Sequence, residues 1–282
     1  MKTVSKVRPS PIAGQWYPGE ATNLASSIDH YLETAQIPEL EGEVVAIMAP
    51  HAGHLYSGPV AAHAFKSLPA RPLELVVVVS PMHHPYPQPL LTTAHMAYYT
   101  PLGEIPVSLS GLAALDMLLE EALGFGLSAV ERDPEHSLEI ELPFLQRRLP
   151  GRFRLLPVMV RDQSRLVAET LGKALAKVLS TRRAILVAST DLSHFYSQST
   201  ARKLDSEVLR EVEAFNPQGV LDIEKEGRGF ACGKAALAAV MWAALELGAN
   251  KAVILNYATS GDVSGDYERV VGYASAAFLR QS

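Results

Sequence analysis

Cysteine is almost missing from the sequence, because Cys232 is the single one among 282 residues. One cysteine cannot form a disulfide within the chain, and such scarcity is typical of proteins from a reducing compartment. We therefore expect a cytoplasmic protein that is held together by its hydrophobic core rather than by cross-links.

Long hydrophobic runs and clusters of basic residues are missing as well. The most apolar helical segment, 235–245, is shorter than the roughly 20 residues that cross a bilayer. The N-terminal segment is interrupted by prolines and lacks the apolar stretch of a signal peptide. The formal charge of −5 argues against a nucleic-acid surface, which needs clustered Lys and Arg to neutralise phosphates. We expect neither membrane nor nucleic acid as a partner. A small molecule or a peptide of unknown identity remains as the expected ligand, and the sequence is compatible with an oligomer.

Apolar runs with strand character alternate with helical patterns along most of the chain. The runs 44–49 and 73–80 flank a helical segment at 59–68, and this βαβ pattern indicates parallel strands. We find no repeat and no linker, so the sequence predicts one α/β domain over 1–282 with a mixed, partly parallel central sheet flanked by helices. The same alternation predicts further strands at 153–160, 184–189, 252–258 and 270–278, and further helices at 112–123, 164–179, 201–215 and 233–247.

Histidine follows three of these predicted strands at the point where each strand ends. Ligands generally bind beyond the carboxyl ends of parallel strands. One histidine in such a place is usually structural, but three strand ends together indicate a metal or acid–base pocket. We expect one member of each of the first two pairs to enter it. The residues are His51 and His54, His83 and His84, and His194 with Asp191 beside it.

Cys232 stands directly before the predicted helix at 233–247. The N-terminus of a helix favours a thiolate, which is the form that binds metals and attacks substrates. A buried, inert thiol is the alternative, since free cysteine often behaves as a small hydrophobic residue. The sequence leaves these two interpretations open.

His136 lies in the acidic segment 133–143, shortly before Glu139 and Glu141. This segment predicts a helix start with Ser137 as its N-cap and the two glutamates in the first turn. Such a start is compatible with a His136 ring that faces the pocket.

Taken together, these motifs resemble the Memo family. The similar segments run nearly from end to end, and their order and spacing carry the resemblance. They are Ala13-Gly-Gln-Trp-Tyr-Pro18, Ala49-Pro-His-Ala-Gly53, Ser80-Pro-Met-His-His84, Glu135-His-Ser-Leu-Glu139 with Leu142-Pro-Phe144, Ser189-Thr-Asp-Leu-Ser-His194, Cys232-Gly233 and Val270-Val-Gly-Tyr-Ala274.

The resemblance implies a fold like that of the class III extradiol ring-cleaving dioxygenases, which are non-haem iron enzymes. Carried over to this sequence, it implies a metal site formed by His51, His83 and Cys232. It places Asp191 and His194 in the same pocket, with His194 where the dioxygenases keep an acid/base histidine. The surroundings would be His54, His84 and His136.

A cysteine replaces the carboxylate that completes the iron site of those dioxygenases. The resemblance implies iron (Fe²⁺) as the cofactor, and the softer thiolate ligand makes copper the alternative. The ligand can also be oxidised itself. Dioxygenase turnover therefore does not follow from the fold.

Four functions remain open. The leading hypothesis is a Memo-like protein that binds a redox metal and has an oxidative or regulatory role. The second is an extradiol-type Fe(II) dioxygenase, in which His194 exchanges a proton and Asp191 orients its ring. The third is a peptide- or protein-binding scaffold with a vestigial active site. The fourth is a cysteine hydrolase that uses Cys232, His194 and Asp191 as nucleophile, base and orienting group.

Overall fold

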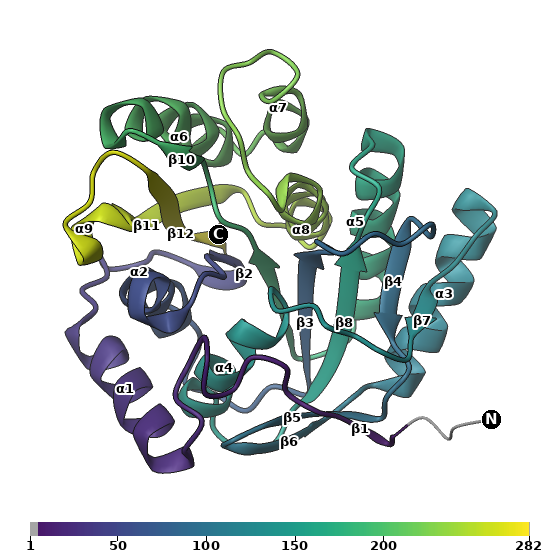
Figure 1. Cartoon of the computed structure of the whole chain (residues 1–282). Helices are drawn as coiled ribbons and strands as arrows, with labels where there is room; N and C mark the ends of the chain where they lie inside the picture. Colours follow the sequence, from purple (N-terminus) through teal and green to yellow (C-terminus); the bar gives the residue numbers. More distant parts are fainter. Residues whose placement is uncertain (1–4, 282) are drawn as a thin grey trace.

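A mixed sheet of nine strands forms the centre of the computed structural model, which describes residues 5–281 (Figure 1). Its middle consists of parallel strands in the order β2 (Glu43–Ala49), β9 (Ala184–Ser189), β3 (Leu75–Pro81) and β8 (Arg154–Val160). Strand β3 is buried along its whole length, as expected of a parallel strand that is covered on both faces. The prediction of an α/β fold with a mixed, partly parallel sheet is confirmed.

Antiparallel pairing occurs on both sides of this parallel centre. On one side β12 (Val270–Arg280) runs antiparallel to β2 and also pairs with β11 (Lys251–Thr259) and β10 (His194–Tyr196). On the other side β4 (Leu90–Thr93) runs antiparallel to β8 and pairs in parallel with β7 (Ser128–Val130). The predicted strands at 252–258 and 270–278 are therefore confirmed as β11 and β12.

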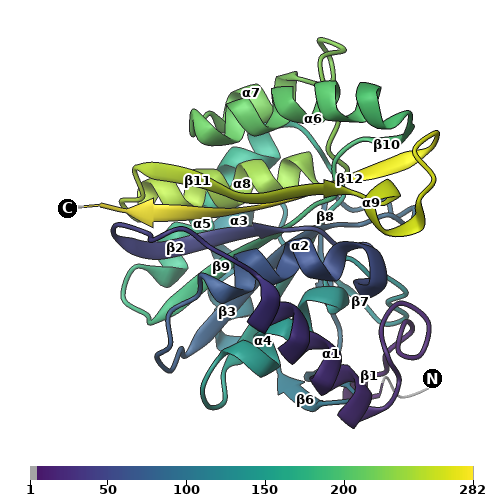
Figure 2. The ribbon, with the colours of Figure 1, turned by 90° about the vertical axis from the view of Figure 1, so that its left-hand side faces the viewer.

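Helices cover both faces of the sheet, as Figure 2 shows with the sheet seen nearly edge-on. One of them, α8 (Lys234–Glu246), packs against both the sheet and other helices, which explains why its sequence is apolar almost all round. The helices on its side of the sheet are α3 (Leu109–Leu123), α5 (Arg165–Leu179), α6 (Gln198–Glu213), α7 (Pro217–Asp222) and α8 (Lys234–Glu246). The helices on the opposite side are α1 (Ala21–Thr34), α2 (His54–Lys66) and α4 (Leu142–Arg148).

Helix α2 begins five residues before the predicted segment at 59–68. Gly53 is its N-cap, and the N–H of His54 donates a hydrogen bond to the carbonyl oxygen of Trp16 at 2.8 Å. Pro59 therefore lies inside the helix, where it removes one backbone hydrogen bond. The connection between β11 and β12 contains one helical turn, α9 (Gly261–Ser264).

None of the helices within residues 5–281 is both long and apolar enough to cross a membrane. The prediction of a single domain over 1–282 stays a prediction, because residues 1–4 and 282 lie outside the described part of the chain.

The N-terminal segment is held in place by a small second sheet. Strand β1 (Val7–Arg8) pairs with β5 (Ala97–Thr100), which pairs with β6 (Gly103–Pro106). Arg8 is only 1% exposed and its guanidinium enters a buried acidic segment. There it donates to the Asp133 carboxylate at 2.6 Å, to the carbonyl oxygen of Glu135 at 2.6 Å and to the Glu139 carboxylate.

Replacing Arg8 by methionine should leave two buried carboxylates without their cation. Breaking a buried ion pair from one side typically costs about 3–5 kcal/mol, so Arg8→Met should lower the free energy of unfolding by about that amount. Urea denaturation measures this loss. Arg147→Met is the control: its ion pair with Asp29 is exposed, and its loss should cost at most about 1 kcal/mol. Equal effects of the two variants would contradict a structural role for the buried pair.

Candidate metal centre

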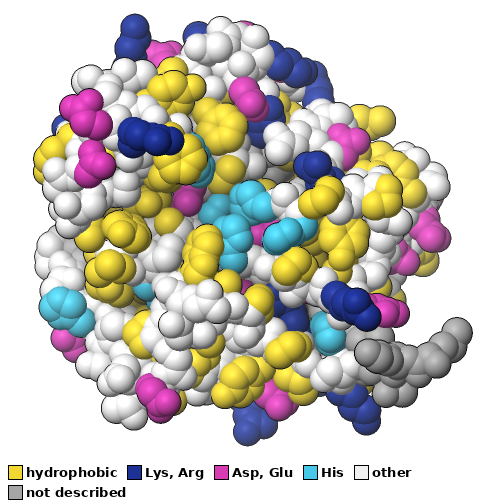
Figure 3. Space-filling view, viewed as in Figure 1, with side chains coloured by type: hydrophobic (Ala, Val, Ile, Leu, Met, Phe, Trp, Pro, Cys, Tyr) yellow, Lys and Arg dark blue, Asp and Glu magenta, His cyan; other side chains and the backbone are white. Residues whose placement is uncertain are grey.

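The carboxyl ends of three adjacent parallel strands form the floor of the candidate site. Strands β2, β9 and β3 are neighbours in the sheet, and His51, Asp191 and His83 each stand two residues beyond the end of one of them. Figure 3 shows histidine side chains gathered at the centre of this face, bordered by hydrophobic side chains. The predicted convergence of strand-end residues is therefore found in the structure.

Three histidines lie close enough together to bind one metal ion. One ring nitrogen from each of His51, His83 and His136 lies within 4.8 Å of the other two. The ring centroids of His51 and His83 are 5.2 Å apart, and those of His83 and His136 are 4.8 Å apart. His136 comes from the loop between β7 and the 3-10 helix η1 (Glu139–Glu141), far from the other two in the sequence.

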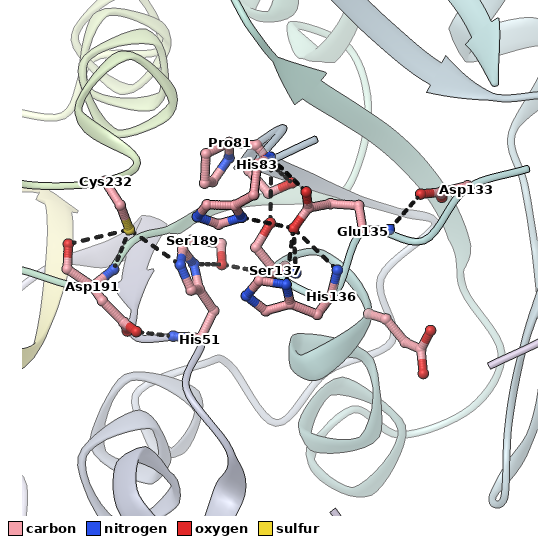
Figure 4. A network of polar contacts seen from close by, with 12 residues as sticks. His51, Pro81, His83, Asp133, Glu135, His136, Ser137, Ser189, Asp191 and Cys232 are labelled. Carbon is pink, nitrogen blue, oxygen red and sulfur yellow. Dashed lines mark hydrogen bonds and ion pairs between the residues drawn. The ribbon is translucent and has the colours of Figure 1, made fainter. Parts of the chain in front are cut away.

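The same nitrogen of each ring faces a polar partner behind the cluster, as Figure 4 shows. His83 Nδ1 lies 2.9 Å and His136 Nδ1 3.3 Å from Oε1 of Glu135. His51 Nδ1 lies 2.9 Å from Oγ of Ser189. Each ring thus turns Nε2 away from these partners as the nitrogen that can bind a metal, and its orientation is set before any metal binds.

Glu135 is the carboxylate that organises this cluster. Besides the two rings, it accepts hydrogen bonds from the backbone N–H groups of His83 at 2.6 Å and of His136 and Ser137 at 3.0 Å. Burial by itself would raise the pKa of Glu135, but the hydrogen bond from His83 and the neighbouring histidines hold it well below its usual range. Glu135 is not among the site residues predicted from the sequence, where it occurs only within a motif. Its position next to His136 was the signal for a supporting role.

The prediction that Ser137 caps a helix is wrong. Its N–H donates to Glu135, and its hydroxyl donates to the carbonyl oxygen of Pro81 at 3.0 Å. The two glutamates do lie in the first turn of η1, as predicted, but both are buried. Glu139 accepts from Arg8 and from the Tyr17 hydroxyl, and Glu141 lies beside Ser189. These side chains therefore bind groups from other, buried segments instead of the N–H groups at the start of a helix.

Cys232 lies at the edge of the histidine cluster, directly before α8. Its Sγ is 3.1 Å from Nε2 of His51 and accepts the backbone N–H of Asp191 at 3.3 Å. The group of ligand atoms that lie close to one another consists of ring nitrogens of the three histidines and does not include this sulfur. Burial and the Asp191 charge raise the pKa of the thiol, so it stays protonated unless a cation binds beside it. A side chain on Gly233 would collide with the Ser189 carbonyl, so glycine is needed for this close approach.

Asp191 and His194 lie beside the cluster on the segment that follows β9. Oδ1 of Asp191 accepts the backbone N–H of His51 at 2.7 Å, and burial raises the pKa of Asp191 to about 7. His194 Nδ1 donates to the carbonyl oxygen of Leu192 at 2.7 Å, which leaves Nε2 without the proton in the neutral ring. Burial also lowers the pKa of His194. Asp191 can therefore change protonation near neutral pH.

The other two pocket candidates have different surroundings. The buried ring of His54 donates from Nε2 to the carbonyl oxygen of Ile140 at 3.0 Å and packs against Tyr17 and Phe144. Burial lowers its pKa to about 4. His84 is partly buried, and its charge contributes to the low pKa of His136, which is about 4 mainly because of burial. That His54 and His84 line the pocket stays a prediction.

Comparison with known proteins agrees with this arrangement. The family model described as "Memo-like protein" matches residues 8–277. The chain belongs to the Memo family. It is 36% identical over 277 residues to a MEMO1 family protein of Methanosarcina mazei, covering 96% of this chain and 98% of the relative. A MEMO1 family protein of Nitrosopumilus maritimus is 32% identical over 278 residues, covering 97% and 100%. One of Thermotoga neapolitana is 36% identical over 282 residues, covering 96% and 99%.

The Asp191 carboxyl should make the stability of this Memo protein depend on pH. Its pKa is about 7 in the fold and near 4 in an unfolded chain, so between these values the folded state binds more protons. Metal-free wild type should therefore lose stability relative to Asp191→Asn as the pH rises from about 4 to about 7. Above about pH 7 the difference should stay constant.

Chemical denaturation of both proteins across this pH range measures the difference, with metal removed because a cation would lower the pKa of Asp191. The asparagine can still accept the N–H of His51, so the backbone contact is retained. A stability difference that does not change with pH would contradict the raised pKa.

Proposed function

We propose that this protein binds a redox-active metal ion through His51, His83 and Cys232 and has an oxidative or regulatory role. The observation that carries the proposal is the shared orientation of the histidine rings. Each Nδ1 faces a fixed partner and each Nε2 is turned away from that partner, although the rings come from three separate segments. Imidazoles held in this way by second partners are typical of protein metal sites.

Iron is the proposed metal, with copper as the alternative. Imidazole suits iron, copper and zinc, and a thiolate next to it shifts the preference towards softer, redox-active ions. The Cys232 sulfur lies at hydrogen-bonding distance from Nε2 of His51, so both atoms can reach one ion after the thiol loses its proton. Such an ion supplies electron transfer. The chain itself supplies Asp191 and His194, which can hold or release a proton beside the ligands.

His136 offers a competing set of three nitrogen ligands with His51 and His83. Only the set with Cys232 contains a sulfur ligand. A thiolate ligand gives an intense charge-transfer absorption with Cu²⁺ or Co²⁺ and an imidazole does not, so the absorption spectrum distinguishes the two sets. If Cys232 is a ligand, Cys232→Ser should abolish this band while His136→Ala retains it. His51→Ala should lower the metal content of the purified protein in either case.

Metal analysis of anaerobically purified protein and titration of the metal-free protein with Co²⁺ measure both effects. His30→Ala is the control, because His30 lies on α1 among a different set of residues. Wild type that binds the metal without this absorption band would replace the cysteine by His136 as the third ligand. Wild type that binds neither iron nor copper stoichiometrically would overturn the proposed function.

Glu135→Gln should weaken metal binding without removing any ligand. The variant loses the carboxylate that holds both His83 and His136, and loss of such a partner typically costs about 10- to 100-fold in metal affinity. Titration with Co²⁺ in a competition assay measures the affinity. Glu131→Gln is the control, since Glu131 is exposed in the same segment and should bind Co²⁺ as the wild type does.

An extradiol-type dioxygenase is the alternative function. Asp191 favours it, because a carboxyl with a pKa of about 7 beside the ligands can exchange protons with a bound phenol. Ring cleavage of a catechol incorporates both atoms of dioxygen, so the reaction needs no further reductant. Iron-loaded protein should then consume oxygen with catechol-like substrates, and Asp191→Asn and His194→Ala should slow it. No uptake across a broad panel would count against this alternative.

A further inference from the structure

The hydroxyl of Ser189 lies at the centre of a buried junction behind His51. Its Oγ is 2.9 Å from Nδ1 of His51, 2.7 Å from the carbonyl oxygen of Ser137 and 2.6 Å from Oε1 of Glu141. All four residues are at most 2% exposed. The only hydrogens available to this junction are therefore those on the groups themselves.

Counting hydrogens decides how this junction is arranged. A serine hydroxyl donates one hydrogen bond and accepts two, whereas the Ser137 carbonyl can only accept. If the Ser189 hydrogen goes to this carbonyl, then His51 and Glu141 must both donate to Ser189. His51 then carries its proton on Nδ1, and Glu141 carries one on Oε1. Every one of these three contacts then joins one donor to one acceptor, as contacts between buried polar groups generally do.

An ionised Glu141 does not satisfy the junction equally well. It would take the only hydroxyl hydrogen and leave the Ser137 carbonyl without that hydrogen bond. Within residues 5–281 no Lys or Arg forms an ion pair with Glu141, and the nearby charge of Asp191 has the same sign. A buried carboxylate with no cation is costly. Burial accordingly raises the pKa of Glu141 well above its usual value.

The other side of the imidazole agrees with this arrangement. Nε2 of His51 lies 3.1 Å from Sγ of Cys232, and a ring with its proton on Nδ1 offers this thiol an acceptor in addition to the Asp191 carbonyl oxygen at 3.5 Å. The ring thus donates from Nδ1 and accepts at Nε2.

We propose that Glu141 is a neutral carboxylic acid that acts through Ser189 as a positioning residue, holding His51 with its proton on Nδ1 and its Nε2 free to bind metal. This inference rests on the proposed metal site, because His51 is one of its ligands. It makes the two histidine ligands unequal. His83 is supported by a carboxylate, which strengthens it as a ligand, whereas His51 is supported by neutral groups.

Two measurements on metal-free protein test the arrangement directly. In protein labelled with ¹⁵N at histidine, the ring nitrogen shifts should show His51 protonated only at Nδ1, and Ser189→Ala should give a mixture of tautomers. Infrared spectra recorded well above the pKa of about 7 of Asp191 should contain the C=O stretch of a protonated carboxylic acid. This band should disappear in Glu141→Gln. It should shift in Ser189→Ala.

Matched variants separate positioning from simple stability. Glu141→Gln keeps a neutral donor in place of the acid, so it should retain both the His51 tautomer and the wild-type affinity for Co²⁺. Ser189→Ala should weaken Co²⁺ binding by about tenfold. Ser275→Ala is the control: this serine is buried, and its hydroxyl has no partner within residues 5–281. It should behave as the wild type in every measurement.

Each outcome has a separate meaning. An unchanged His51 tautomer in Ser189→Ala, or the absence of a protonated carboxyl band in the wild type, overturns the inference. If Glu141→Gln does not fold, ¹³C-glutamate labelling of the wild type still assigns the band, because only a glutamate carboxyl then shifts. The expected tautomer and band in a protein that binds no metal would refute the proposed function and leave this arrangement standing.

Discussion

The Glu135 carboxylate joins the two loops that carry His83 and His136, and the candidate site depends on this junction. It accepts three backbone N–H groups and faces two imidazole rings, so it fixes both the course of the loops and the direction of the rings. A buried carboxylate is stable only where such donors surround it. The Ser137 hydroxyl, which donates to the Pro81 carbonyl oxygen, joins the same two loops, although 52 positions of sequence separate His83 from Glu135.

A second layer of charge holds the Glu135 segment itself. The guanidinium of Arg8 enters from β1 and contacts the Asp133 carboxylate, the Glu135 carbonyl and the Glu139 carboxylate. Strand β1, close to the start of the chain, thus stabilises a loop that is distant from it in the sequence. Because guanidinium groups form several directed hydrogen bonds at once, one residue can fix the geometry of a whole segment. The geometry of the histidine cluster therefore depends on Arg8, a residue that is not part of the cluster.

The site combines groups whose protonation differs at neutral pH. Glu135 is a carboxylate, Asp191 titrates near pH 7, and the Cys232 thiol keeps its proton in the absence of a cation. Solvation explains the difference, because Glu135 has many donors while Asp191 and Cys232 are buried with fewer. Binding a cation at this place would favour the ionised forms of both, which couples metal binding to proton release.

The sequence by itself determined the fold class and the strand ends where the chemistry lies. Hydrophobic periodicity located β2, β3, β8 and β9 to within a few residues, because a buried parallel strand has a continuous apolar run that little else produces. The position of His51 and His83 after such strands followed from this pattern. The short strands β4, β5, β6 and β7 carry no comparable run, since their pairing depends on neighbours rather than on their own periodicity.

Only the tertiary structure decided how the site residues are held. Periodicity says which face a residue takes but not which distant group it meets, so the roles of Glu135, Ser189 and Glu141 could not be read from their local sequence. The segment 133–143 shows this most clearly. Its local pattern fits a helix start with Ser137 as the N-cap. In the fold, Arg8 and the end of β3 supply other partners for its polar groups. Contacts between segments far apart in the chain, and the burial that strengthens them, made this choice.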